Sequence, residues 1–132
     1  MELKRVVVTG LGALTPIGNT KDEYWDGLVN GKSGAAPITY YDTEKFKTKF
    51  ACELKDFTVT DFIDRKESRK MDKFAQYAMV AADEAILDSK LDLETVNKLR
   101  VGVIWGAGIG GLETFQNEVL NFADGDGTPR FN

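Results

Sequence analysis

The sequence predicts an α/β fold built around a buried, mostly parallel sheet that this chain alone leaves incomplete. Two short apolar runs, residues 4–9 (KRVVVT) and 101–105 (VGVIW), are typical of strands buried on both faces. Each run is followed by a glycine-rich turn and then by a helical pattern. Because a buried strand needs neighbours on both edges, we expect the missing strands to come from a longer chain or from a partner.

The composition is that of a single soluble domain, residues 1–132. Hydrophobic residues make up 42% of the chain and charged residues 29%, and no apolar run reaches the length of a membrane span. The N-terminus leads directly into the first predicted strand, which leaves no room for a signal peptide, so we expect a cytoplasmic protein. The net charge of −4 gives no support to nucleic-acid binding.

The sequence has one cysteine and no histidine, which limits the chemistry available to it. An internal disulfide is excluded, and we expect neither a structural metal site nor a cofactor. Most acyl-transfer and hydrolytic chemistry at neutral pH uses imidazole as the acid or base. If the chain belongs to an enzyme that uses such chemistry, its catalytic residues must therefore lie elsewhere.

The first helix is predicted from Thr20 to Asn30. Glu23 lies three residues after Thr20, as in a capping box, although Asn19 could serve as the cap instead. Its apolar residues fall on one helical face, and Asn30 with Gly31 ends it. Later, the alternation of residues 46–54 predicts a half-exposed strand with Cys52 pointing inward. That environment favours a small buried hydrophobe over a reactive nucleophile.

A long helix is predicted after the basic cluster, which we define as residues 65–70 (RKESRK). Apolar residues, many of them alanine, recur there at intervals of three and four until residues 88–90 end the pattern. An alanine-rich face permits the close approach of another backbone. Residues 92–98 are expected to form a short helical linker to the second apolar run.

The basic cluster itself allows two interpretations. It carries four positive charges and one negative charge on an acidic chain. It could be no more than the solvated start of a helix, although positive charge is unfavourable at a helix N-terminus. It could equally be a docking surface for an anionic partner, which would be attracted by long-range electrostatic steering.

The glycine turn, residues 106–111 (GAGIGG), separates the second apolar run from a helix predicted over residues 112–123. Ile109 is its one bulky side chain, and it either fills a gap in the core or lines an apolar pocket. The core is favoured because isoleucine is usually buried. The turn also matches the dinucleotide pattern G-x-G-x-x-G, but no second strand with an acidic end follows at the required distance, which disfavours nucleotide binding.

Three segments together carry a family resemblance. They are residues 5–19 (RVVVTGLGALTPIGN), 65–72 (RKESRKMD) and 106–112 (GAGIGGL). In this order and spacing, the chain resembles the N-terminal portion of the β-ketoacyl-acyl-carrier-protein synthase II condensing enzymes. The resemblance implies a thiolase-like fold of alternating α and β layers (αβαβα), of which this chain is the first part, and a homodimer.

The resemblance also implies a reaction and a partner. Condensing enzymes transfer an acyl group from acyl carrier protein to a cysteine thiolate, and a carbanion formed by decarboxylation of malonyl-carrier protein then attacks the thioester. The nucleophile and two histidines of this family lie beyond the segment matched here, and Cys52 does not correspond to the nucleophile. We therefore expect no catalytic residue in this chain and no condensing activity from it alone.

Several binding residues do carry over by resemblance. Lys66, Arg69 and Lys70 match residues that receive the acidic helix of the carrier protein, and Arg130 matches a further carrier-contacting arginine. Ile109 matches the apolar residue at the end of the acyl pocket, which reverses the preference for a plain core position. The alternative is a non-catalytic module for carrier binding or dimerisation, but an unpartnered buried strand favours part of a larger enzyme.

Overall fold

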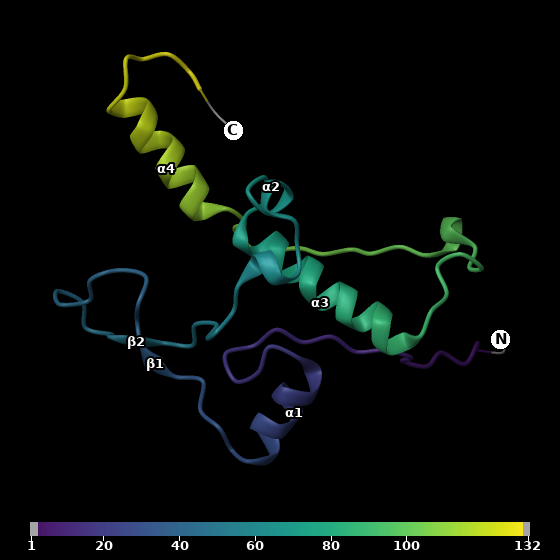
Figure 1. The fold of residues 1–132 in the computed structure, drawn as a ribbon. Coiled ribbons are helices and arrows are strands. Elements are labelled where there is room, and N and C mark those ends of the chain that lie inside the picture. Colours follow the sequence, from purple (N-terminus) through teal and green to yellow (C-terminus); the bar gives the residue numbers. More distant parts are fainter. Residues whose placement is uncertain (1–2, 131–132) are drawn as a thin grey trace.

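The computed structural model describes residues 3–130 as helices joined by long extended segments (Figure 1). The α-helices are α1 (Lys21–Val29), α2 (Arg65–Ser68), α3 (Lys73–Ser89) and α4 (Leu112–Ala123). Two short strands, β1 (Ala36–Pro37) and β2 (Phe50–Ala51), pair antiparallel with Ala36 opposite Ala51. Short 3-10 helices, η1 (Val59–Asp61) and η2 (Lys98–Arg100), lie in the connections.

Helix α3 is the element against which the N-terminal segment packs. A Cβ atom on Gly12 would lie 1.9 Å from the backbone oxygen of Ala81, and one on Gly10 would lie 2.2 Å from that of Ala85. Only glycine fits at either position, since real Cβ atoms essentially never come that close to backbone. The close approach expected of the alanine-rich helix face is therefore confirmed.

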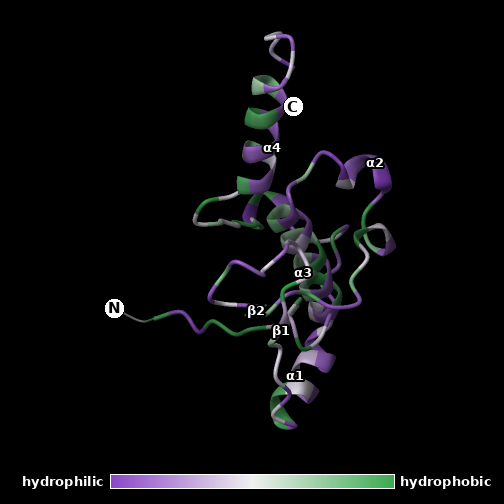
Figure 2. Ribbon diagram, turned by 90° about the vertical axis from the view of Figure 1, so that its left-hand side faces the viewer, coloured by the Kyte–Doolittle hydropathy of each residue, from purple (hydrophilic) through white to green (hydrophobic). Residues whose placement is uncertain are grey.

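The two apolar runs do not form strands, so the predicted parallel sheet is wrong for the chain by itself. Residues 4–9 and 101–105 are extended but unpaired, with Val6 87% and Ile104 99% exposed. Figure 2 shows hydrophobic colour along both extended stretches. Strand hydrogen bonds need a neighbouring strand, and the described residues place none beside either run. The apolar sequence of each run thus has no partner within residues 3–130.

The predicted strand over residues 46–54 is mostly wrong as well. Only Phe50–Ala51 pairs, and Cys52 is exposed instead of pointing into a core. A two-residue antiparallel pair has no sheet face large enough to bury alternate side chains, and Phe46 and Phe50 are exposed too. Among the described residues, the buried hydrophobic side chains are only Ala78 and Val80, both on α3.

Helix α1 begins and ends as predicted. The Glu23 backbone N–H donates to the Thr20 hydroxyl at 3.2 Å, as in a capping box, but the Glu23 carboxylate accepts at 2.7 Å from the backbone N–H of Asn19, one residue before the Thr20 cap. Asn30 is the C-cap, and Gly31 follows with a φ of 64°. The apolar face of this helix is largely uncovered, since Trp25 is 67% exposed.

The remaining helices match the predictions at most of their ends. Helix α3 begins at Lys73, so the basic cluster contributes a separate short helix, and it ends at Lys90 in the left-handed conformation with a φ of 55°. The predicted helical linker over residues 92–98 is wrong, since a turn there leads into η2. Helix α4 covers residues 112–123 as predicted. None of the described helices combines the length and apolar character that crossing a membrane requires.

Candidate functional site

The basic cluster forms α2 and the turn after it. Asp64 caps this helix, because its carboxylate accepts hydrogen bonds from the backbone N–H groups of Lys66 at 2.8 Å and Glu67 at 3.3 Å. A carboxylate at the cap offsets the unfavourable placement of positive charge at a helix N-terminus. The cationic side chains of the cluster are all exposed: Arg65, Lys66, Arg69 and Lys70.

The four cations are not equivalent. The Lys70 ammonium lies 2.7 Å from the Glu67 carboxylate, three residues earlier, and both side chains are exposed. Within residues 3–130, none of Arg65, Lys66 and Arg69 has a carboxylate at ion-pair distance. The cluster therefore presents three unneutralised cations, and Lys70 as a partly neutralised one.

The cluster is anchored to α3 by Gln76. Its side-chain amide nitrogen donates to the backbone oxygens of Ser68 at 2.8 Å and Met71 at 3.1 Å. Ser68, the last residue of α2, is only 4% exposed, and its hydroxyl donates to the Arg65 backbone oxygen at 3.1 Å. These contacts fix the backbone that carries the basic side chains while the side chains themselves stay in solvent.

The glycine turn lies beside the start of α3. Gly110 has a φ of 79°, a conformation that favours glycine. A Cβ on Gly111 would lie 2.1 Å from a carboxylate oxygen of Asp72. Ile109, at the tip of the turn, is 80% exposed, so the core position favoured by spacing alone is wrong for this chain. Its assignment to an acyl pocket stays a prediction.

The cluster and the turn meet in a hollow of about 560 Å³ between α3 and the start of α4. Arg69 lines it from the cluster, Gly110 lines it from the turn, and Phe74 and Tyr77 line it from α3. Arg130 is not part of this hollow. It lies beyond the far end of α4, where its guanidinium is 3.1 Å from the Asp126 carboxylate, and Figure 1 shows α4 running away from α2.

Two side chains of α3 that line the hollow, Tyr77 and Lys73, have raised pKa values. Burial, followed by the neighbouring Tyr40, raises the pKa of Tyr77 to about 12, so its hydroxyl stays neutral. The hydrogen bond to Glu113, at 2.8 Å, raises the pKa of Lys73, so its ammonium stays charged. That ammonium also lies 4.6 Å from the centre of the Tyr40 ring, within cation–π range.

The arrangement can bind and position, but it offers no nucleophile paired with a base. The sequence contains no histidine, and Cys52 is exposed. Within the part of the chain that the structure describes, no group of three or more potential ligands is arranged to hold a metal ion. The sequence did not single out the contacts of Asp72, Gln76 or Thr114. Asp72 and Thr114 come from segments far apart in the chain, and Gln76 bonds the backbone of Ser68, so neither contact has a periodic signal.

Comparison with known proteins matches residues 3–130 to the family "Beta-ketoacyl synthase, N-terminal domain". The chain is 48% identical over 118 residues to 3-oxoacyl-[acyl-carrier-protein] synthase 2 of Synechocystis, covering 89% of this chain and 28% of that protein. It is 50% identical over 113 residues to the enzyme of the same name from Staphylococcus aureus strain COL, covering 86% of this chain and 27% of that protein. The chain thus spans less than a third of the length of these curated relatives.

Two solved structures resemble the described chain. The ishigamide ketosynthase/chain length factor matches with a TM-score of 0.73 and 32% identity, over 93% of this chain and 30% of that one. A type II PKS acyl-carrier protein in complex with its ketosynthase, AntDE:AntF, matches with a TM-score of 0.73 and 29% identity, over 92% of this chain and 31% of that one. Both are ketosynthases, which have the thiolase-like fold, and the chain belongs to the β-ketoacyl synthase family, within its N-terminal domain.

Proposed function

We propose that this chain is the N-terminal part of a 3-oxoacyl-acyl-carrier-protein synthase 2, an acyltransferase of fatty-acid elongation. The identity of 48–50% to enzymes of that name, over 86–89% of the chain, is the observation that carries the proposal. The reaction joins an enzyme-bound acyl thioester to malonyl-carrier protein and yields 3-oxoacyl-carrier protein and CO2. The cysteine and histidines for that chemistry would lie in the part of the enzyme that follows the matched segment, residues 3–130.

The exposed apolar surface supports placement within a larger enzyme. Residues 4–9 and 101–105 would become inner strands of a layered αβαβα core once neighbouring strands flank them. Helix α4 has an exposed apolar face as well, with Leu112, Phe115 and Val119 all exposed, which suits further packing or a homodimer contact. A free-standing binding module is disfavoured because, among residues 3–130, its buried hydrophobic core would contain only Ala78 and Val80.

Within that enzyme, the basic cluster would bind the acyl carrier protein. Lys66 and Arg69 are exposed and unneutralised, Lys70 is close by, and α2 is held firmly against α3. Arg130 would add a second, separate contact. One solved relative is a ketosynthase in complex with its acyl-carrier protein, which supports a carrier as the partner class. Ile109, at the tip of the glycine turn, would end the acyl pocket.

The test uses the full-length enzyme with two substrates, acyl-carrier protein and a small acyl thioester that lacks the carrier. We expect the triple variant Lys66→Glu, Arg69→Glu and Lys70→Glu to raise the apparent KM for the carrier on the order of tenfold and to flatten its salt dependence. Activity with the small thioester should change little, because that substrate makes no contact with the cluster.

A matched control reverses the same number of positive charges in another part of the chain. Lys45, Lys47 and Lys49 are exposed lysines on the loop that leads into β2, and their triple glutamate variant should leave the carrier KM near the wild-type value. An unchanged KM in the cluster variant, or an equal rise in the control, would remove the docking assignment. A wild-type enzyme without carrier-dependent condensation would overturn the proposed function itself.

A further inference from the structure

We propose that Asp72 is a positioning residue that holds the basic cluster and the glycine turn in a fixed relation through a contact with Thr114. On this proposal, which rests on the proposed function, Asp72 affects how productively a docked carrier delivers its acyl chain, and it has little effect on how tightly the carrier binds. Asp72 would contact neither the carrier nor the acyl chain.

The side chain of Asp72 is directed away from its own helix. Asp72 is the N-cap residue of α3, and its backbone oxygen accepts from the Ala75 N–H at 2.9 Å. Its carboxylate makes no capping hydrogen bond to α3 and instead accepts one from the Thr114 hydroxyl in the first turn of α4. An aspartate at this position usually caps the helix that follows it. Because this carboxylate bonds a different helix instead, we infer a role in tertiary structure.

The glycine turn is shaped to admit this carboxylate. Gly111 is the N-cap of α4 with a φ of −77°, a value open to any residue, so its backbone conformation does not require glycine. What glycine provides is space for the carboxylate, because a Cβ on Gly111 would lie 2.1 Å and 2.6 Å from the two carboxylate oxygens of Asp72 and would force that side chain to move. The carboxylate also lies at the N-terminal end of α4, where negative charge is favoured.

A continuous set of contacts then links the turn to the basic cluster. Asp72 joins α4 to the start of α3, and Gln76, one turn along α3, bonds the backbone of Ser68 and Met71 beside the basic side chains. The ion pair between Lys73 and Glu113, at 2.8 Å, crosses the same junction. That pair is exposed on both sides, as is the Asp72–Thr114 contact. What sets the Asp72–Thr114 contact apart is that the Asp72 carboxylate also lies against the backbone of the glycine turn at Gly111.

The consequence is that the basic cluster and the glycine turn behave as one rigid unit. A carrier held on Lys66 and Arg69 is then placed at a fixed distance from Ile109, two residues before Gly111. Misplacing a reacting group by about 1 Å can cost on the order of a hundredfold in rate, so a loosened junction should affect turnover. Affinity should be affected less, because the basic side chains stay exposed and charged.

The test compares turnover of the full-length enzyme with acyl-carrier protein and with a small acyl thioester. Thr114→Val keeps the shape of the side chain but removes the donor. We expect kcat with the carrier to fall about 5- to 20-fold, with a carrier KM near wild type and a much smaller loss with the small thioester. Thr114→Ser, which restores the hydroxyl, should recover most of the carrier rate.

A second comparison separates positioning from local structural damage. In an enzyme that already carries the three cluster glutamates, Thr114→Val should cause no further carrier-specific loss. The basic cluster that Asp72 and Thr114 position no longer binds the carrier in that enzyme. Equal losses with both substrates, or no loss with either, would overturn the proposal while leaving the proposed function intact. A wild-type enzyme without carrier-dependent condensation would overturn both.

If Thr114→Val does not accumulate as folded enzyme, Asp72→Asn gives the same comparison. The amide oxygen can still accept from Thr114, but the charge at the start of α4 is lost, so an intermediate carrier-specific loss is expected. A carrier-to-thioester rate ratio equal to that of the wild type in this variant would also contradict the positioning role.

Discussion

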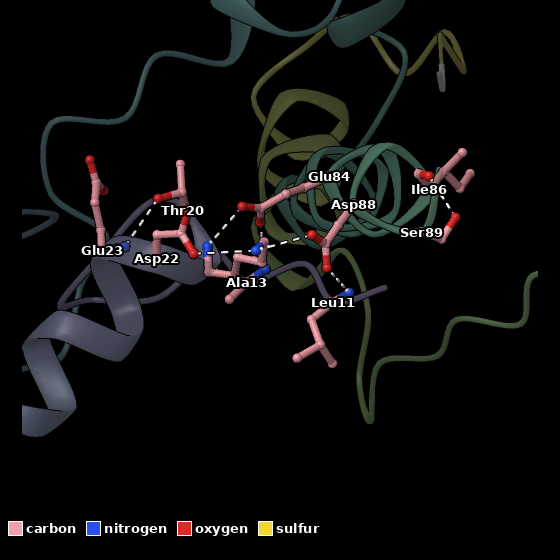
Figure 3. A network of polar contacts seen from close by, with 10 residues as sticks. Leu11, Ala13, Thr20, Asp22, Glu23, Glu84, Ile86, Asp88 and Ser89 are labelled. Carbon is pink, nitrogen blue, oxygen red and sulfur yellow. Dashed lines mark hydrogen bonds and ion pairs between the residues drawn. The ribbon is translucent and has the colours of Figure 1, made fainter. Parts of the chain in front are cut away.

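The carboxylate of Glu84 on α3 accepts a hydrogen bond from the backbone N–H of Ala13 at 2.8 Å, although 71 positions separate the two residues (Figure 3). Its other oxygen accepts from the Lys21 backbone N–H, also at 2.8 Å, at the first residue of α1. One turn further along α3, Asp88 accepts from the Leu11 N–H at 3.0 Å. Two carboxylates of one helix thus hold the backbone of the glycine-rich N-terminal segment.

Replacing Glu84 should therefore loosen that segment. Glu84→Ala leaves two backbone donors without their acceptor, and we expect it to lower the free energy of unfolding by about 1–3 kcal/mol. Glu84→Gln, which keeps one acceptor oxygen, should cost less. The measurements are urea unfolding and hydrogen exchange at Ala13 and Lys21. Asp83→Ala, at an exposed carboxylate one residue earlier, is the control, and equal effects at both positions would contradict the assignment.

The ion pair of Asp88 with Lys21, at 3.0 Å, predicts a pH dependence of stability. The pKa of Asp88 is lowered, first by the Leu11 N–H and then by Lys21, whereas the pKa of Lys21 is raised, first by Asp88. A lowered carboxyl pKa stabilises the fold above its unfolded value, and that contribution is lost as the pH falls through the folded pKa. A raised lysine pKa stabilises below its unfolded value and loses that contribution as the pH rises through the folded one.

We therefore expect this pair to contribute fully between the ordinary values of 3.8 for the aspartate and 10.5 for the lysine, and to lose its contribution outside that window. Asp88→Asn should lower the urea midpoint at neutral pH and flatten its dependence on pH at both extremes. Asp83→Asn should leave the wild-type profile unchanged. A profile of Asp88→Asn that runs parallel to the wild type throughout would mean that the pair does not stabilise the fold.

Local signals predicted the helices well, because caps and periodicity involve neighbours in sequence. Thr20 and Glu23 correctly predict the start of α1. The sequence after the glycine turn correctly predicts α4 over its full length. The apolar runs at 4–9 and 101–105 predict burial that the described chain does not supply. A strand forms only when it hydrogen-bonds to a neighbouring strand, which its own sequence does not contain. The apolar runs therefore predict burial correctly only if those neighbours are present.

The candidate site, too, could be predicted only where its features depend on neighbours in sequence. The charge of the basic cluster is visible in the sequence, and the pairing of Lys70 with Glu67 joins residues only three positions apart, one on α2 and one in the turn that follows it. The glycine turn is visible too, but the reason for Gly111 is not, because it depends on a carboxylate that approaches from 39 positions earlier. The contact between Asp72 and Thr114 belongs to tertiary structure and has no periodic signature.

The pairing of Lys70 with Glu67 makes a prediction about carrier binding. Glu67→Gln removes the neighbouring negative charge and frees the Lys70 ammonium, which lies 2.7 Å away. We expect the apparent KM of the full-length enzyme for acyl-carrier protein to fall about twofold at low salt, with the difference disappearing at high salt. Glu44→Gln, an exposed carboxylate outside the cluster, is the control. A higher KM in Glu67→Gln would mean that the ion pair holds the basic cluster in its binding arrangement, and does not reduce the attraction of Lys70 for the carrier.

Ile109 offers a test of the pocket assignment through substrate length. It is 80% exposed in this chain and has no packing role within the described residues, so enlarging it should not disturb the fold of this segment. If it ends the acyl pocket of the full-length enzyme, Ile109→Phe should shorten the longest accepted acyl chain, while Ile109→Val should leave that limit unchanged or extend it slightly. Rates with a series of acyl-carrier substrates of increasing length measure this limit, and rates with the shortest member provide the internal control. The same length profile in Ile109→Phe as in the wild type would mean that the acyl chain does not reach this residue, and the glycine turn would then serve α4 and Asp72 alone.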